Sequence, residues 1–217
     1  KNLRKKPFVH PGLKNVTSVT NVVLKKDVLL HFPYHSFNSV IDLLREAAID
    51  PDVVSIKITC YRLADRSKII NTLTNAVRNG KQVTVVLELR ARFDEEANLE
   101  YKEELEDAGV KVLFGVHNMK VHAKICLIKK RVNNKTTHYG FVSTGNLNEK
   151  TATVYSDTCL LTSDRNIMAD VNRIFSYLEQ PKTRIHLLQQ CNTLIVSPTG
   201  MRRQLLQMIN KEIKNAL

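Results

Sequence analysis

The sequence predicts an α/β protein in which helices flank both faces of a mixed β-sheet. Apolar strand-like runs alternate with amphipathic helical segments between residues 36 and 116. This rhythm favours parallel strands joined by right-handed helical crossovers. Two further strand-like runs, 120–130 and 138–144, flank the polar turn "RVNNKTT", as in an antiparallel hairpin. The sheet is therefore expected to contain both strand directions.

The individual elements follow from apolar periodicity and from residues that begin or end helices. Five apolar residues recur at helical spacing after a candidate N-cap, Ser36 or Ser39, and "DPD" ends that helix. The next two helices are expected to end at Gly80 and Gly109. The predicted strands are 53–61, 81–89, 110–116, 120–130, 138–144 and 156–163, and the other predicted helices are 67–80, 94–109 and 164–180.

Three parts of the chain are expected. Residues 1–26 are basic and irregular, and 27–180 form the main domain. The polar stretch "PKTR" opens a linker, so that 181–217 hold a linker, one strand and one amphipathic helix. A strand and a helix cannot bury their own apolar stripe, so this part either begins a second α/β domain or packs back on the first.

Composition narrows the class of protein. A hydrophobic share of 43% in 217 residues argues against disorder, and the four cysteines lie far apart, as for reduced cytoplasmic thiols. No apolar run approaches the roughly 18 residues of a spanning helix.

The net charge of +12 attracts polyanions, namely nucleic acid, an anionic membrane surface or a phosphate chain. The chain does not begin with Met and is expected to be a piece of a longer protein.

One predicted strand carries two polar residues where apolar ones are expected. In "NMKVHAKICLIKK", alternation places His122 and Lys124 on one face, together with Cys126 and Ile128. They are expected about 7 Å apart, at roughly 3.3 Å per residue. A strand covered on both faces rarely accepts such a pair without a use for it.

Other polar residues are expected at the same edge of the sheet. Ligands of open α/β sheets bind beyond the carboxyl ends of the strands, where Arg62 and Arg92 follow two predicted strands. Asn146, in "STGNLN", follows the strand that pairs antiparallel with the His122 strand. Each residue alone has an ordinary structural explanation, such as a solvated charge or a turn. Their convergence predicts a site.

The motifs around these residues resemble known families. "VHAK" followed by "STGNLN" resembles the H-x-K…G-S-x-N signature of the phospholipase D superfamily, with Thr144 in place of the serine and Lys129 where the usual aspartate stands. Over residues 27–217 the chain resembles the bacterial polyphosphate kinase family, in its first phospholipase-D-like catalytic domain and the start of the second. The stretches that carry this resemblance are "DVLLHFPYHSF", "CYRLADRSKII", "ELRARFDEEANL", "KVHAKICLI", "TGNLNEKTATVYSD" and "LLTSD".

The resemblance implies reversible transfer of the terminal phosphate of ATP to polyphosphate. It implies that His122 becomes phosphorylated, that Arg62 and Arg92 hold phosphates and the accompanying Mg²⁺, and that Tyr155 contacts the nucleotide. ATP or ADP and polyphosphate are the expected partners, and nucleic acid is not. A homo-oligomer is expected for the full-length protein, without a membrane span, and peripheral membrane association stays open.

The residue types suit this chemistry. A neutral imidazole accepts a phosphoryl group well, and guanidinium groups grip phosphate oxygens in a fork. Lys124 adds a point charge beside the transferred group, and Asn146 donates to further oxygens. Asp157 follows Asn146 by 11 positions (157 − 146), a spacing similar to that of the orienting carboxylate in phospholipase-D-like nucleases. We therefore prefer Asp157 to Glu149 as the acceptor that orients His122.

Two other functions remain open at this point. The first is a phospholipase-D-like nuclease or lipase that works as a dimer, with one H-x-K from each subunit. The second is a non-catalytic domain that binds a polyanion. The missing aspartate and the "ELRARFDEEANL" block disfavour the first, and a 6% share of aromatic residues gives little support for base stacking in the second.

Overall fold

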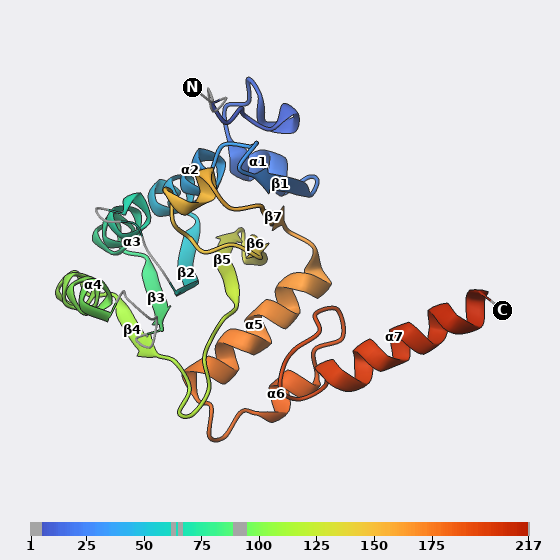
Figure 1. The fold of residues 1–217 in the computed structure, drawn as a ribbon. Helices are drawn as coiled ribbons and strands as arrows, with labels where there is room; N and C mark the ends of the chain where they lie inside the picture. The colour runs from blue at the N-terminus through green and yellow to red at the C-terminus, as the bar shows by residue number, and fades with distance from the viewer. Residues whose placement is uncertain (1–5, 62–63, 65–66, 89–94, 217) are drawn as a thin grey trace. The chain divides into compact units, whose positions relative to one another are not determined.

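The structure is a computed structural model that describes residues 6–61, 64, 67–88 and 95–216. The chain divides into two compact units, Lys1–Asp164 and Arg165–Leu217. The described strands belong to the first unit and form a seven-stranded mixed sheet in the order β1-β7-β6-β5-β2-β3-β4 (Figure 1). Their bounds are Val28–Phe32 (β1), Val53–Cys60 (β2), Gln82–Leu87 (β3), Lys111–Phe114 (β4), Lys124–Val132 (β5), Lys135–Ser143 (β6) and Asp157–Thr162 (β7).

Strand directions agree with the predicted fold class. β2, β3 and β4 pair in parallel, whereas β5 pairs antiparallel with both β2 and β6. The hairpin between β5 and β6 turns tightly at Asn133 and Asn134, which have φ angles of 48° and 61°. Two residues with positive φ are typical of a type I′ turn. The predicted seven-residue turn is therefore too long, because both strands continue into it.

Helices of the first unit cover the parallel half of the sheet. In Figure 1, α2, α3 and α4 lie along one side of β2, β3 and β4. The N-cap of α2 is Phe37, so the prediction of Ser36 or Ser39 at this position is wrong; the Ser36 hydroxyl instead accepts from the Asn38 N–H. The helices are η1 (Pro11–Leu13), α1 (Val19–Val23), α2 (Asn38–Ile49), α3 (Lys68–Arg78), α4 (Glu95–Asp107) and η2 (Thr151–Thr153).

The central strands are buried on both faces. Cys126 and Ile128 of β5 belong to the main core cluster, and Ile125 and Leu127 on the opposite face are at most 3% exposed. Alternate residues of a strand point to opposite faces, so the sheet is covered on each side. This agrees with the fold predicted from the sequence.

The second unit contains α5 (Arg165–Glu179), α6 (His186–Gln189) and α7 (Met201–Ala216). The strand predicted after residue 191 is wrong, because 192–199 form bends and turns. The buried Asp170 carboxylate accepts the backbone N–H groups of Asn192, Thr193 and Leu194 at 2.7–3.0 Å. Those donors are therefore not available to a strand ladder. The predicted division into 1–26, 27–180 and 181–217 stays a prediction.

Candidate active site

Strand ends converge on one edge of the sheet. Phe114 is in register with Leu87, which is in register with Cys60, so β2, β3 and β4 end together. Lys124 at the start of β5 is in register with Ser143 at the end of β6. β7 begins beside that residue and beside the end of β1. We call this the carboxyl edge, and it is the edge at which the sequence places His122 and Asn146.

His122 lies just before β5, not within it. The strand begins at Lys124, so the prediction that both residues share one face of a strand is wrong. The imidazole is exposed, and its ring meets the Tyr61 ring edge to face, with centroids 5.1 Å apart and planes at 73°. An exposed ring at the carboxyl edge is accessible to a ligand.

Lys124 is buried, with 3% of its surface exposed. Its ammonium donates to the backbone carbonyl of His122 at 2.6 Å and lies 5.0 Å from the centroid of the Tyr61 ring. A buried ammonium needs such acceptors, because burial of an uncompensated charge is costly. The lysine thus supports the backbone of His122 directly.

Two more buried polar residues contact the segment that carries His122. The Thr59 hydroxyl donates to the Ala123 carbonyl at 2.7 Å and accepts from the Ile125 N–H at 3.0 Å. A carboxylate oxygen of Glu88 accepts the Val121 N–H at 2.9 Å. Sequence reasoning missed both residues. The available signal was a polar residue at the carboxyl end of each strand, Thr59 near the end of β2 and Glu88 just after β3.

The turn after β6 has an ordered hydrogen-bond pattern. The Ser143 hydroxyl accepts from the Gly145 N–H at 3.2 Å and donates to the Thr158 carbonyl at 3.1 Å. Asn146 is half-buried, and its Oδ1 is buried without a hydrogen-bond partner in the described structure. An amide oxygen in this state is a place where a bound group can form a missing contact.

Asp157 and Tyr155 lie next to this turn. Oδ1 of Asp157 accepts from the Thr144 hydroxyl at 2.8 Å. Within the described residues, no hydrogen bond joins Asp157 to His122, so its orienting role stays a prediction. Tyr155 is 63% exposed. A broad exposed aromatic ring offers a surface for stacking.

Glu149 holds the start of α3. One of its carboxylate oxygens accepts the Lys68 N–H at 2.8 Å and lies 3.4 Å from the Ser67 hydroxyl. Its other oxygen is buried without a partner in the part of the chain that the structure describes. A carboxylate at a helix N-terminus is favourable because it accepts otherwise unpaired N–H groups. Glu149 therefore has a structural role that links the turn after β6 to α3.

The two predicted arginines lie outside the described residues. Arg62 follows β2 by two positions and Arg92 follows β3 by five (62 − 60; 92 − 87). Their roles toward phosphate and Mg²⁺ stay predictions. The described residues contain no group of three or more His, Cys, Asp or Glu side chains that could hold a metal ion.

The buried thiols near this edge are not suited to nucleophilic chemistry. Burial raises the pKa of the Cys60 thiol to about 12 and that of Cys159 to about 12. Burial also raises the pKa of Cys126 well above its usual value. Thiols in this state remain protonated near neutral pH, and the thiolate is the reactive form.

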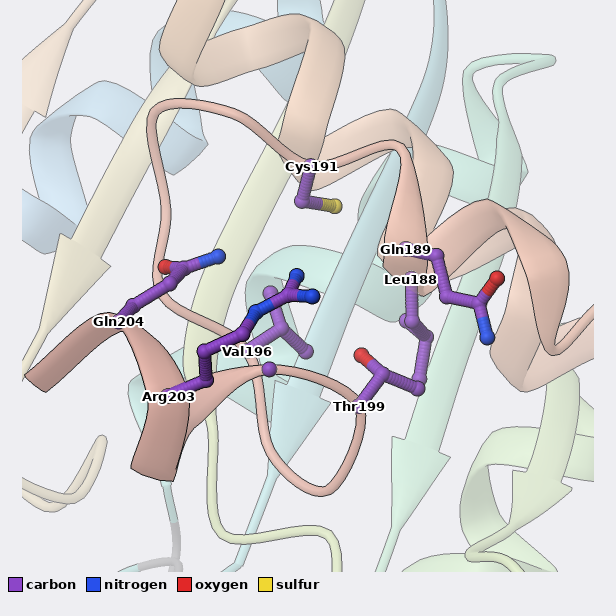
Figure 2. A pocket seen from close by; sticks show the side chains of 8 residues that line it. Leu188, Gln189, Cys191, Val196, Thr199, Arg203 and Gln204 are labelled. Atoms are coloured by element: carbon purple, nitrogen blue, oxygen red, sulfur yellow. The ribbon is translucent and has the colours of Figure 1, made fainter. Parts of the chain in front are cut away.

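A cavity of about 260 Å³ lies in the second unit (Figure 2). None of the predicted site residues lines it. Its lining comes from α6, the loop after it and the start of α7: Leu188, Gln189, Cys191, Val196, Thr199, Gly200, Arg203 and Gln204. The cavity therefore does not belong to the carboxyl edge.

The fold is that of phospholipase-D-like proteins. The structure of a phospholipase D family member, Nuc from Salmonella typhimurium, superposes with a TM-score of 0.53 at 15% identity, covering 71% of this chain and 91% of that chain. The polyphosphate kinase structure from Porphyromonas gingivalis superposes with a TM-score of 0.84 at 37% identity, covering 100% of this chain and 35% of that chain.

Sequence comparisons define the family. The model of polyphosphate kinase C-terminal domain 1 matches residues 18–184. Polyphosphate kinase from Vibrio vulnificus (strain YJ016) is 46% identical over 210 residues, covering 97% of this chain and 29% of that protein. The Escherichia coli (strain K12) polyphosphate kinase is 45% identical over 196 residues, covering 90% of this chain and 28% of that protein. The chain belongs to the polyphosphate kinase family and spans less than a third of these relatives.

No helix in the described part of the chain is both long and apolar enough to cross a bilayer.

Proposed function

We propose that the full-length protein transfers the terminal phosphate of ATP to polyphosphate through a phosphohistidine at His122. The observation that carries this proposal is the exposed imidazole at the carboxyl edge, in a chain of the polyphosphate kinase family. Hydrogen bonds to buried side chains hold the backbone on either side of this ring. A fixed and accessible imidazole suits a two-step transfer, because it splits one difficult displacement into two easier ones.

The first proposed step forms a bond between an imidazole nitrogen of His122 and the γ-phosphorus of ATP. The bond from that phosphorus to the β–γ bridging oxygen breaks, and ADP leaves. In the second step a terminal oxygen of polyphosphate bonds to the same phosphorus, the P–N bond breaks, and the neutral imidazole is restored. The reverse order of steps makes ATP from polyphosphate.

Neighbouring residues have proposed parts in this reaction. Oδ2 of Asp157, which has no hydrogen-bond partner among the described residues, accepts from the second ring nitrogen of His122. Asn146 and Lys124 place polar and positive groups beside the phosphate, and Arg62 and Arg92 grip its oxygens. Tyr155 stacks against the nucleotide base.

In this proposal Mg²⁺ arrives with ATP. It prefers oxygen ligands, often one or two carboxylates together with phosphate oxygens, whereas guanidinium groups are not ligands. The described residues offer no group of acids and histidines for it. When bound, Mg²⁺ neutralises charge on the phosphates; the proposed roles of the side chains do not depend on its position.

The net charge of +12 supports a polyanionic substrate. Positive charge concentrates a phosphate chain near the protein and speeds its association. We propose polyphosphate and ATP or ADP as the partners and a homo-oligomer as the functional form of the full-length protein.

The test is incubation of the full-length protein with γ-labelled ATP. We expect acid-labile, base-stable label on His122, no label in His122→Ala, and normal labelling in a matched variant, His117→Ala. His117 lies earlier in the same segment. Transfer that survives in His122→Ala would contradict the proposal and leave this domain as a polyanion-binding module. Hydrolysis of a model phosphodiester without ATP would instead favour a phospholipase-D-like phosphodiesterase.

A further inference from the structure

The segment that presents His122 is neither helix nor strand for most of its length. Residues 115–123 connect β4 to β5, and they contain a turn closed by the Met119 N–H, which donates to the Val116 carbonyl at 3.0 Å. Backbone outside regular structure needs other partners for its N–H and C=O groups. Here those partners are buried side chains of the neighbouring strands and of β5.

Glu88 is a buried acid at this edge, with 4% of its surface exposed. It directly follows β3, and its own N–H donates to the Cys60 carbonyl at 3.2 Å, so its backbone is fixed on the end of β2. Its Oε2 accepts the N–H of Val121, one residue before His122. The same oxygen lies 3.4 Å from where a Cβ on Gly115 would stand, so the segment also passes closely over the carboxylate.

Thr59 fixes the other side of His122. Its hydroxyl bridges the Ala123 carbonyl and the Ile125 N–H, and the residue is 2% exposed. The backbone on both sides of His122 is thus tied to Thr59 of β2 and to Glu88, which directly follows the adjacent parallel strand β3. Neither the carboxylate nor the hydroxyl has a part in the phosphoryl transfer described above.

We propose that Glu88 and Thr59 are positioning residues that set where the His122 imidazole stands. This inference rests on the proposed function of His122. Glu88 acts as a hydrogen-bond acceptor for Val121, and Thr59 acts as a bridge between Ala123 and Ile125. Their loss leaves the imidazole chemically intact but lets the segment shift, and a displacement of about 1 Å from the reactive geometry costs up to roughly 100-fold in rate.

The experiment measures single-turnover labelling of His122 from γ-labelled ATP in the full-length protein. ATP affinity and the thermal midpoint are measured on the same samples. We expect Glu88→Ala and Thr59→Val to slow labelling by about 10- to 100-fold, with ATP affinity within about 3-fold of wild type. Glu88→Gln replaces the carboxylate with an amide, whose oxygen can still accept the Val121 N–H. We expect the labelling rate of this variant to lie within about 3-fold of wild type.

Thr84→Val is the matched control for Thr59→Val. Thr84 is also a buried threonine of the parallel strands, 7% exposed, and it lies in the first half of β3, away from the carboxyl edge. We expect it to label at the wild-type rate. We expect the thermal midpoint to fall equally in both threonine variants, whereas only Thr59→Val labels slowly. That result would show that Thr59 acts by positioning His122 and not through general stability.

Three results would overturn the inference: wild-type labelling in Glu88→Ala, equal slowing in both threonine variants, or Glu88→Gln as slow as Glu88→Ala. The last result would show that Glu88 acts through its negative charge and not by accepting the Val121 N–H. Absence of label on His122 in the wild-type protein would instead remove the proposed function itself, so the two failures are distinguishable.

Discussion

The carboxylate of Asp157 lies against the backbone of Gly145. A Cβ placed on Gly145 would stand 2.6 Å from Cγ of Asp157 and 2.6 Å from its Oδ2. Real Cβ atoms do not approach other atoms so closely. The turn after β6 therefore meets the first residue of β7 only because residue 145 has no side chain.

Gly145→Ala is expected to disturb this contact. The added methyl group must push the Asp157 carboxylate or the turn aside, which costs about 1–3 kcal/mol of stability, as for other overpacked sites. We expect slower labelling of His122 as well, because Asn146 lies in the same turn. Urea unfolding and single-turnover labelling measure the two effects.

Gly80→Ala is the control for that substitution. Gly80 has a φ of +78°, and no atom lies within 4 Å of where an alanine Cβ would stand, so alanine strains the backbone there by about 1 kcal/mol without a clash. This variant is expected to lose stability but to label normally. A labelling defect of equal size in both variants would show that lost stability, and not the turn, explains the Gly145→Ala result.

Asp157→Asn is expected to slow labelling of His122 by at least about 10-fold, within the range of general acid–base effects. The amide cannot supply the negative charge that stabilises a developing imidazolium. Thr144→Val removes the hydroxyl that occupies Oδ1 of Asp157 and leaves the proposed acceptor, Oδ2, in place. We expect a loss below about 3-fold for this variant. Labelling of Asp157→Asn at the wild-type rate would contradict the orienting role.

Regular elements of the fold were predictable because their burial is periodic. β2 and β3 are rich in buried apolar residues, and the helices after them are followed by glycines with positive φ. The start of β5 was misplaced because alternation of side chains continues from Val121 into Ile125. Alternation in a sequence does not show where hydrogen-bonded pairing begins.

Contacts between distant residues could not be predicted. β1 was missed because its partner, β7, lies far along the chain. The predicted strand after residue 191 had the right apolar residues, but Asp170 accepts the N–H groups that a ladder requires. The importance of Glu88 and Thr59 depends on which backbone groups they meet, which appears only in three dimensions.

Alkaline pH is expected to destabilise the fold through its thiols. Burial raises the pKa of Cys60 to about 12, whereas the ordinary thiol value is 9.0. Between these values the unfolded chain binds fewer protons than the folded chain, so stability is present below about pH 9 and falls as the pH rises toward about 12. Urea unfolding at several pH values measures this slope. We expect a shallower slope in Cys60→Val, and an unchanged slope would contradict the assignment.

Asp170 is expected to hold the second unit together. It is 1% exposed, accepts three backbone N–H groups and pairs with Arg173 at 2.6 Å. Asp170→Ala leaves these donors unsatisfied and is expected to cost about 3–5 kcal/mol. Faster hydrogen exchange at residues 192–194 reports the loss. The exposed Asp107→Ala serves as the control, and equal exchange in the two variants would argue against this role.

Polyphosphate binding is expected to weaken as salt rises. The surplus of positive charge arises from 33 Lys and Arg against 21 Asp and Glu, and Lys and Arg that neutralise phosphates release the counterions condensed on the polyanion. Titration of polyphosphate at increasing KCl concentrations should give a linear fall of log affinity with log salt concentration. An affinity that is flat between low and high ionic strength would contradict electrostatic capture.

The pairing of β1 with β7 dictates an order of events during synthesis. Val28, Leu30 and Phe32 leave the ribosome well before their register partners Leu161, Cys159 and Asp157, which follow more than 120 residues later. β2, β3 and β4 can associate as they emerge, while β1 waits with its apolar side chains in water. Translation must proceed past residue 162, the end of β7, before β1 can join the sheet. We therefore expect the nascent chain to be most prone to aggregate just before that point.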